Sequence, residues 1–113
     1  MLNQIVLVGR LVRDPELKET ENGINLTRIT LAIPRSYKHT NGEYETDFID
    51  CTLWRGIAQN TVEYCKQGDI VGVKGRVESS VYEKEGKKVY AMNVIAEKVT
   101  FLSSKNSSEE EAS

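Results

Sequence analysis

Residues 47–82, DFIDCTLWRGIAQNTVEYCKQGDIVGVKGRVESSVY, decide the fold, because their hydrophobic period changes twice. From about 46 to 55 apolar and polar residues alternate, which is the pattern of a strand with one buried face. From 56 to 68 apolar residues recur at helical spacing, and Gly68 stands where a left-handed C-terminal cap is expected. From 69 to 82 the alternation returns. The stretch therefore predicts a strand, a short helix and a second strand.

The rest of the chain adds three alternating segments, at residues 3–12, 24–33 and 89–101. The expected order is three strands, one short helix between strands 3 and 4, and two strands. That order is typical of the OB-fold, an all-β, five-stranded Greek-key barrel. Glycines at positions 9, 72 and 75 suit strands that bend tightly in a barrel. A five-stranded sheet covered by one helix is the alternative.

Two polar segments are expected to turn the chain between strands. Residues 36–45 contain Asn41-Gly42, a strong turn signal, and they follow Pro34, which ends regular pairing or marks a sheet edge. Residues 83–88, EKEGKK, predict a charged hairpin tip.

The strand before the helix places its two large aromatics on its polar face. Ile49, Cys51 and Leu53 alternate onto one face, which we expect to be the core. Phe48 and Trp54 fall on the other face, together with an aspartate and a threonine. A buried core would not place aromatic side chains beside an aspartate and a threonine, and exposure to water does not favour them. We therefore expect these aromatics to face a ligand.

Two tyrosines and several cations extend this pattern. Tyr82 shares the polar face of the strand after the helix with Lys74 and Arg76, and Tyr37 follows Arg35 in the loop before Phe48. Bases of single-stranded nucleic acid stack on aromatic side chains for about 1–3 kcal/mol each, and their phosphates need cations along the same path. The pattern indicates a stacking surface. Burial of these aromatics under a loop or a partner chain is the alternative.

Composition fits one domain of ordinary size and gives no overall basic charge. The chain has 113 residues, of which 39% are apolar and 28% charged, and its formal net charge is −2. Residues 103–113 hold one Lys and three Glu, so residues 1–102 are neutral. Any basic surface must therefore come from how the charges are distributed.

Several function classes are not expected. No apolar run approaches the ~20 residues that span a bilayer, and no basic leader precedes Ile5–Val8, so we expect a cytoplasmic protein. Cys51 and Cys65 are expected to be free buried thiols, with a disulfide or metal pair as the alternative. The single histidine, His39, lies in a polar stretch, and we find no nucleophile motif or metal-ligand cluster. We therefore expect no enzyme activity, metal or cofactor.

The chain resembles the bacterial single-stranded DNA-binding protein (SSB) family. The resemblance rests on NQIVLVGRLVRDPEL, TLAIPRSYK, NGEYETDFIDCTLWRGIAQNTVEYCKQGDIVGVKGR and VYEKEGKKVYAMNVIAE, and covers about residues 1–102. It implies an OB-fold domain over 1–102, a homotetramer, and single-stranded DNA as the partner, bound without sequence preference. Residues 103–113 are expected to be a short disordered acidic tail. The implied processes are replication, recombination, repair or DNA uptake, at the nucleoid.

The resemblance also assigns site residues. The family's stacking positions fall on Tyr37, Phe48, Trp54 and Tyr82, the four aromatics that the face argument selects. Its phosphate-contacting cations are drawn from Arg10, Lys18, Arg35, Arg55, Lys74, Arg76, Lys87 and Lys88. An RNA-binding OB domain and a protein-interaction barrel are the alternative functions.

Two departures from the family pattern matter. Many members carry an arginine two places before the stacking residue of strand 4, where this chain has Ser80 with Glu78 upstream. This predicts a weaker electrostatic contribution. Housekeeping members also end in an acidic tip with apolar residues that recruits replication and repair proteins, whereas SSEEEAS has only an alanine. The chain therefore resembles the short paralogues, or a phage or plasmid version, more than the housekeeping form, and we expect no recruitment of repair proteins through this segment.

Overall fold

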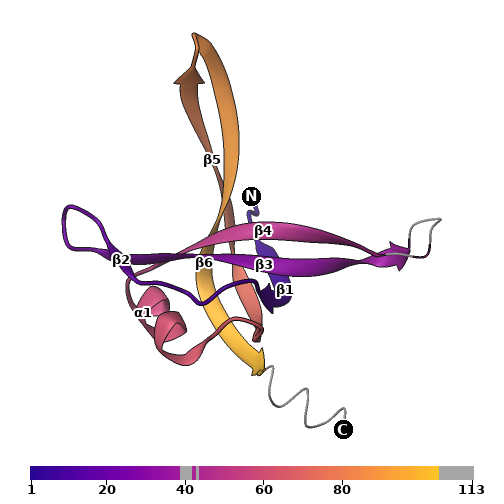
Figure 1. The fold of residues 1–113 in the computed structure, drawn as a ribbon. Coiled ribbons are helices and arrows are strands. Elements are labelled where there is room, and N and C mark those ends of the chain that lie inside the picture. Colours follow the sequence, from indigo (N-terminus) through magenta and orange to yellow (C-terminus); the bar gives the residue numbers. More distant parts are fainter. Residues whose placement is uncertain (39–41, 43, 105–113) are drawn as a thin grey trace, which may run out of the picture.

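Six strands and one helix make up the described fold, in a computed structural model that describes residues 1–38, 42 and 44–104 (Figure 1). The elements in chain order are β1 (Ile5–Leu11), β2 (Lys18–Glu19), β3 (Asn25–Lys38), β4 (Tyr44–Trp54), α1 (Arg55–Tyr64), β5 (Ile70–Lys84) and β6 (Lys87–Ser103).

The long strands close into a five-stranded barrel. Their order is β1-β5-β6-β4-β3, and β3 returns to β1 through Arg10 opposite Ala32 and Leu11 opposite Leu31. All of these pairings are antiparallel except β4–β6, which is parallel. The barrel with α1 between its third and fourth strands confirms the predicted OB-fold. The two-residue strand β2, which pairs with the start of β3, was not predicted.

The core lies inside the barrel, where alternate residues of each strand meet. Its fully buried members include Leu11, Ile29, Leu31, Leu53, Val71 and Val73. Gly75 shows how tightly the strands pack, since a Cβ there would lie 2.0 Å from the backbone oxygen of Ile95. Cys51 and Cys65 are free and buried, as expected, and burial raises the pKa of the Cys51 thiol to about 11.

The helix α1 is shorter than predicted, because the amides that follow it find other partners. Ala58 and Thr61 are buried on its inner face, but the helix ends at Tyr64. The N–H of Cys65 still donates to the carbonyl of Thr61, but those of Lys66, Gln67 and Gly68 donate to the carboxylates of Asp69 and Asp14 and to the carbonyl of Leu11. Gly68 has the expected positive φ of 91°, yet it lies in the following turn and does not cap the helix.

Two hairpin arms project from the barrel (Figure 1). One is formed by β3 and β4, whose regular register ends at Pro34 opposite Thr46, in agreement with the sequence. β3 continues to Lys38, so part of the predicted loop 36–45 is strand. The other arm is formed by β5 and β6, which turn through Glu85 and Gly86, both with positive φ, as the predicted tip requires.

Parts of some expectations fall on residues that the structure does not describe. His39 and Asn41 lie outside the described residues, as do residues 105–113 of the predicted tail. Ser103 is the last residue of β6. Among the described residues, no helix has the length and apolar character needed to cross a membrane.

Candidate nucleic-acid interface

The outer face of β4 carries the two aromatics that the sequence placed there. Cys51 and Leu53 are fully buried, whereas Phe48 is 65% and Trp54 38% exposed. Six residues of extended strand separate Phe48 from Trp54, which corresponds to roughly 20 Å. This confirms the predicted division of β4 into a core face and an outward aromatic face.

Cross-strand pairing shows which residues flank these aromatics, because directly opposed residues share a face of the sheet. Trp54 lies opposite Leu26, which lies opposite Lys18 of β2. Phe48 lies opposite Ala32, which lies opposite Arg10 of β1. Two of the predicted cations, Lys18 and Arg10, therefore lie in the same cross-strand rows as the stacking candidates Trp54 and Phe48.

Between those rows, the middle of the face is polar. Thr30 donates a hydrogen bond of 2.6 Å to Oδ1 of Asp50. In the next row Arg28 of β3 lies opposite Thr52 of β4. Thr52 pairs with Ile95 of β6, and Ile95 lies opposite Arg76 of β5. The row crosses four strands and has an arginine at each end.

Tyr82 belongs to the same face but stands on the β5–β6 arm. It is 51% exposed and lies six residues beyond Arg76 along β5 without an intervening register shift. Even-numbered residues of this part of β5 therefore point to one side, Tyr82 among them. Beyond it, Lys84 and Lys87 lie directly opposite each other. Such like-charge pairs are unfavourable unless an anion lies between or beside them.

The fourth stacking candidate, Tyr37, lies in β3 beyond the register shift after Pro34. Its backbone extends the β3–β4 arm, whereas its side chain is outside what the structure describes.

The predicted cations do not all lie on the face that carries the aromatics. Arg10, Lys18, Lys74, Arg76 and Lys87 lie on the outward face of the sheet, on which Phe48, Trp54 and Tyr82 stand. Arg10 also donates to the carbonyl of Gly68 at 2.9 Å. Lys88 lies opposite Glu83 on the other side of its arm. Arg55 is exposed next to Trp54, where its φ of 57° turns the chain from β4 into α1.

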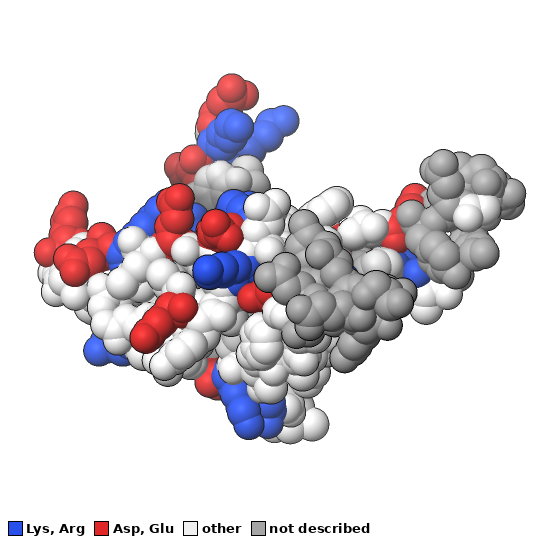
Figure 2. All heavy atoms as spheres, turned by 60° about the horizontal axis from the view of Figure 1, so that its bottom comes forward, with Lys and Arg blue, Asp and Glu red and all other residues white. Residues whose placement is uncertain are grey.

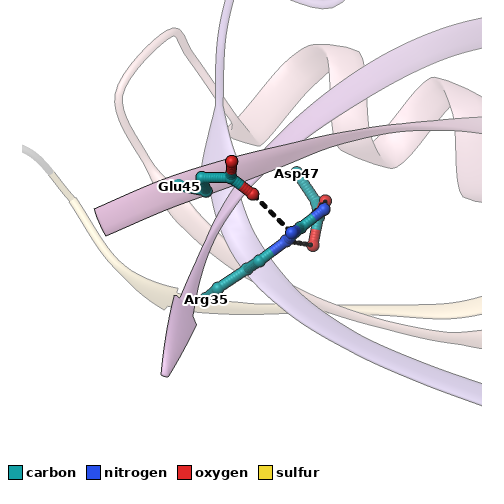
Figure 3. A network of polar contacts seen from close by, with 3 residues as sticks. All are labelled: Arg35, Glu45 and Asp47. Atoms are coloured by element: carbon teal, nitrogen blue, oxygen red, sulfur yellow. Dashed lines mark hydrogen bonds and ion pairs between the residues drawn. The ribbon is translucent and has the colours of Figure 1, made fainter. Parts of the chain in front are cut away.

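Arg35 contacts Glu45 and Asp47 of β4 (Figure 3), and Asp47 lies on the face of β4 opposite to that of Phe48. Its guanidinium donates to both carboxylate oxygens of Asp47, at 2.9 and 3.2 Å, and forms an ion pair with Glu45. Asp47 pairs with Ile33, which places this network on the core side of the strands. The hydrogen bond from Arg35 holds the pKa of Asp47 below its usual value. A phosphate that binds Arg35 therefore has to displace the carboxylates of Asp47 and Glu45. Arg35 makes more contacts of this kind than the other predicted phosphate ligands.

Arg76 faces outward but is also paired with carboxylates. Its guanidinium lies 3.1 Å from Glu78 and 3.8 Å from Glu97, and all three side chains are about half exposed. Exposed ion pairs of this kind are weak, so a phosphate can replace them at little cost. They nevertheless lower the positive potential where a backbone would pass.

The sequence reasoning missed three cations of this surface. Arg28 stands on the outward face of β3, where strict alternation already placed it. Lys84 lies in the predicted hairpin tip, two residues beyond Tyr82 on the same side of the arm. Lys98 lies opposite Lys74 only because a register shift occurs between Lys74 and Gly75, which no alternation rule reveals.

Positive and negative side chains are mixed over the surface. Figure 2 shows red and blue residues interspersed on one side of the molecule, with both colours on the projecting β5–β6 arm. Among the described residues no group of three or more His, Cys, Asp or Glu side chains is placed to hold a metal ion. The surface offers aromatic stacking and separate cations, a combination suited to single-stranded nucleic acid.

The barrel and this outward face define a binding module of the OB class. The chain belongs to the single-strand binding protein family, whose model matches residues 2–102. It is 47% identical over 106 residues to single-stranded DNA-binding protein B of Bacillus subtilis, covering 93% of this chain and 94% of that protein. It is 45% identical over 113 residues to single-stranded DNA-binding protein 2 of Listeria monocytogenes, covering 99% and 71%.

The relatives differ in how much of their length the chain spans. It covers 63% of the single-stranded DNA-binding protein of Bacillus cereus, with 45% identity over 107 residues. The family description and the names of these relatives refer to binding and not to catalysis.

Proposed function

We propose that this protein binds single-stranded DNA without sequence readout as its main mode, by base stacking and phosphate contacts. The observation that carries the proposal is the exposure of Phe48, Trp54 and Tyr82 on one continuous face of the sheet. Each stacked base contributes about 1–3 kcal/mol, and the rows of cations beside them provide the electrostatic part. The names of the relatives support DNA as the ligand.

The stacking residues of the proposal are Tyr37, Phe48, Trp54 and Tyr82. The phosphate contacts are assigned to Arg10, Lys18, Arg55, Lys74, Arg76 and Lys87, with Arg28, Lys84 and Lys98 added from the structure. Arg35 and Lys88 contribute less, because they lie on the other side of their strands. Replication, recombination, repair and DNA uptake are the processes in which such a protein acts, at the nucleoid in the cytoplasm.

A homotetramer is part of the proposal, and strand β1 supports it. Val6 and Val8 of β1 are 65% and 51% exposed. β1 pairs with β5 along its length but with β3 only at Arg10 and Leu11. One edge of β1 is therefore open from Ile5 to Gly9 within the described part of the chain. An open strand edge with exposed apolar side chains favours association with another strand, and a second copy supplies one.

Residues 105–113, KNSSEEEAS, are proposed not to recruit replication or repair proteins. A partner pocket needs an apolar anchor beside the carboxylates, because exposed charges alone contribute little. This segment offers only Ala112. Deleting 105–113 leaves β6 intact, so the truncated protein should fold, assemble and bind DNA. Repair proteins captured from an extract by the 113-residue chain but not by the truncated one would contradict this.

The test of the main proposal compares three ligands. Fluorescence anisotropy of labelled dT, rU and duplex DNA, each of 30 nucleotides or base pairs, measures the dissociation constants. Tight binding of dT and weak binding of duplex supports the proposal. Equal or tighter binding of rU supports the RNA-binding alternative, and no binding of any of the three supports a protein-interaction barrel.

A further inference from the structure

A carboxylate stands in the middle of the aromatic face. Asp50 shares the outward face of β4 with Phe48, two residues before it, and with Trp54, four residues after it. Its side chain is exposed. This is an unexpected position for an anion, because a phosphate brought there by the stacked strand would be repelled.

Thr30 fixes the orientation of this carboxylate. Thr30 is buried, lies opposite Asp50 and donates a hydrogen bond of 2.6 Å to its Oδ1. Within the part of the chain that the structure describes, this is the hydrogen bond that Asp50 makes, and no ion pair joins it. Oδ2 is therefore an oriented acceptor on the surface.

The surroundings of Asp50 have room for a base. A hollow of about 430 Å³ opens beside it, between the stretch of β4 that holds Phe48 and Asp50 and residues of β1, β5 and β6, and most of its lining is apolar. Two residues of strand separate Phe48 from Asp50, which corresponds to roughly 7 Å. A base that stacks on Phe48 therefore lies within reach of the Asp50 carboxylate.

The chemistry of a carboxylate distinguishes between pyrimidines. Cytosine carries an N4 amino group, which donates to carboxylates, whereas thymine carries a carbonyl oxygen at that position. Thymine has one N–H, but it lies between two carbonyl oxygens that the carboxylate repels. A fixed anion on this face therefore lowers the relative affinity for thymine.

We propose that Asp50, oriented by Thr30, favours cytosine over thymine at the base that stacks on Phe48. This rests on the proposed binding of single-stranded DNA and adds a base preference to it. The negative charge of Asp50 weakens the binding of any DNA strand, because it repels phosphate. The preference is therefore measured as the ratio of the affinities for dC and dT oligonucleotides and not by either affinity alone.

The experiment compares dC and dT 30-mers at pH 8, where cytosine is uncharged, by anisotropy with the full chain. Asp50→Asn keeps an acceptor for Thr30 but turns an amide N–H₂ toward the base, and Asp50→Ala removes the polar group. Circular dichroism checks that both variants fold. A matched control is Glu97→Gln, which removes one negative charge from the same face beside Arg76.

Both Asp50 variants are expected to tighten binding and to shift the dC-to-dT affinity ratio toward dT by about 3- to 10-fold, the usual range for one hydrogen bond. Glu97→Gln is expected to leave the ratio unchanged. A ratio that is the same in the parent protein and in both Asp50 variants overturns the assignment of Asp50, while DNA binding itself stands. If the parent protein binds neither oligonucleotide, the proposed function fails and the base preference fails with it.

Discussion

Arg35 of β3 donates three hydrogen bonds to the carboxylate of Asp47 of β4, on the side of the arm that faces away from Phe48. This bidentate contact joins the two strands of the arm diagonally across the last regular pair, Pro34 opposite Thr46. The same contact engages the guanidinium of Arg35, which the family resemblance assigns to phosphate binding. We therefore expect Arg35 to act chiefly as a structural residue of the arm.

The pKa of Asp47 tests this contact. Because the folded pKa lies below the usual value of 3.8, the contact stabilises the fold above about pH 4 and is lost as the pH falls through the folded pKa. We expect Arg35→Ala to raise the Asp47 pKa in a carboxyl NMR titration and to change DNA affinity little. Arg28→Ala, on the outward face, should weaken DNA binding clearly. The opposite ranking of the two arginines would show that Arg35 is a phosphate ligand.

Tyr82 and Tyr90 form a matched pair on the β5–β6 arm. Both are exposed, but Tyr82 points to the side of Arg76 and Tyr90, opposite Val81, to the other side. Tyr82→Ala should cost about 1–3 kcal/mol of binding free energy for dT oligomers, by loss of stacking. Tyr90→Ala should cost much less. Equal losses in an anisotropy titration would mean that DNA does not distinguish the faces of the arm.

Ser80 offers a second face-specific test, in this case of charge. Ser80 shares the face of Tyr82, and its neighbour Ser79 lies on the opposite face, across from Met92. Ser80→Arg should tighten binding and steepen the log–log salt dependence by about 0.7, the value for one added phosphate contact on single strands. Ser79→Arg adds the same charge and should change the slope less. An unchanged slope for Ser80→Arg rules out a phosphate path past this position.

The open edge of β1 makes the proposed homotetramer testable. Val6→Glu and Val8→Glu place charges where burial between subunits is proposed, so each should lower the mass found by light scattering. The control is Val81→Glu, an equally exposed valine on the β5–β6 arm. A parent protein that scatters as a monomer of 12.7 kDa at micromolar concentration contradicts the tetramer outright.

The sequence predicted those parts of the site that depend on strand alternation alone. Cys51 and Leu53 point inward while Phe48 and Trp54 point outward, because a strand repeats every two residues. The same rule placed Arg28 correctly, although its relation to Trp54 needed the pairing of β3 with β4.

Features that depend on distant partners could not be predicted in this way. The end of α1 is set by Asp14 and Leu11, which lie far away in the sequence and accept the amides of Gln67 and Gly68. The register shift after Lys74 brings Lys98 to the outer surface against the local alternation. Likewise, nothing in the residues around Arg35 shows that two carboxylates of the next strand will hold it.

Trp54 reports directly on base stacking, because it is the only tryptophan of the chain and lies at the end of the aromatic face. Its emission should be followed during a titration with dT 30-mer, with binding monitored in parallel by anisotropy of the labelled oligonucleotide. We expect strong quenching that saturates together with the anisotropy, because a base stacks on the indole. Emission that stays unchanged while the anisotropy shows saturated binding would mean that no base stacks on Trp54 and would contradict the proposed stacking surface.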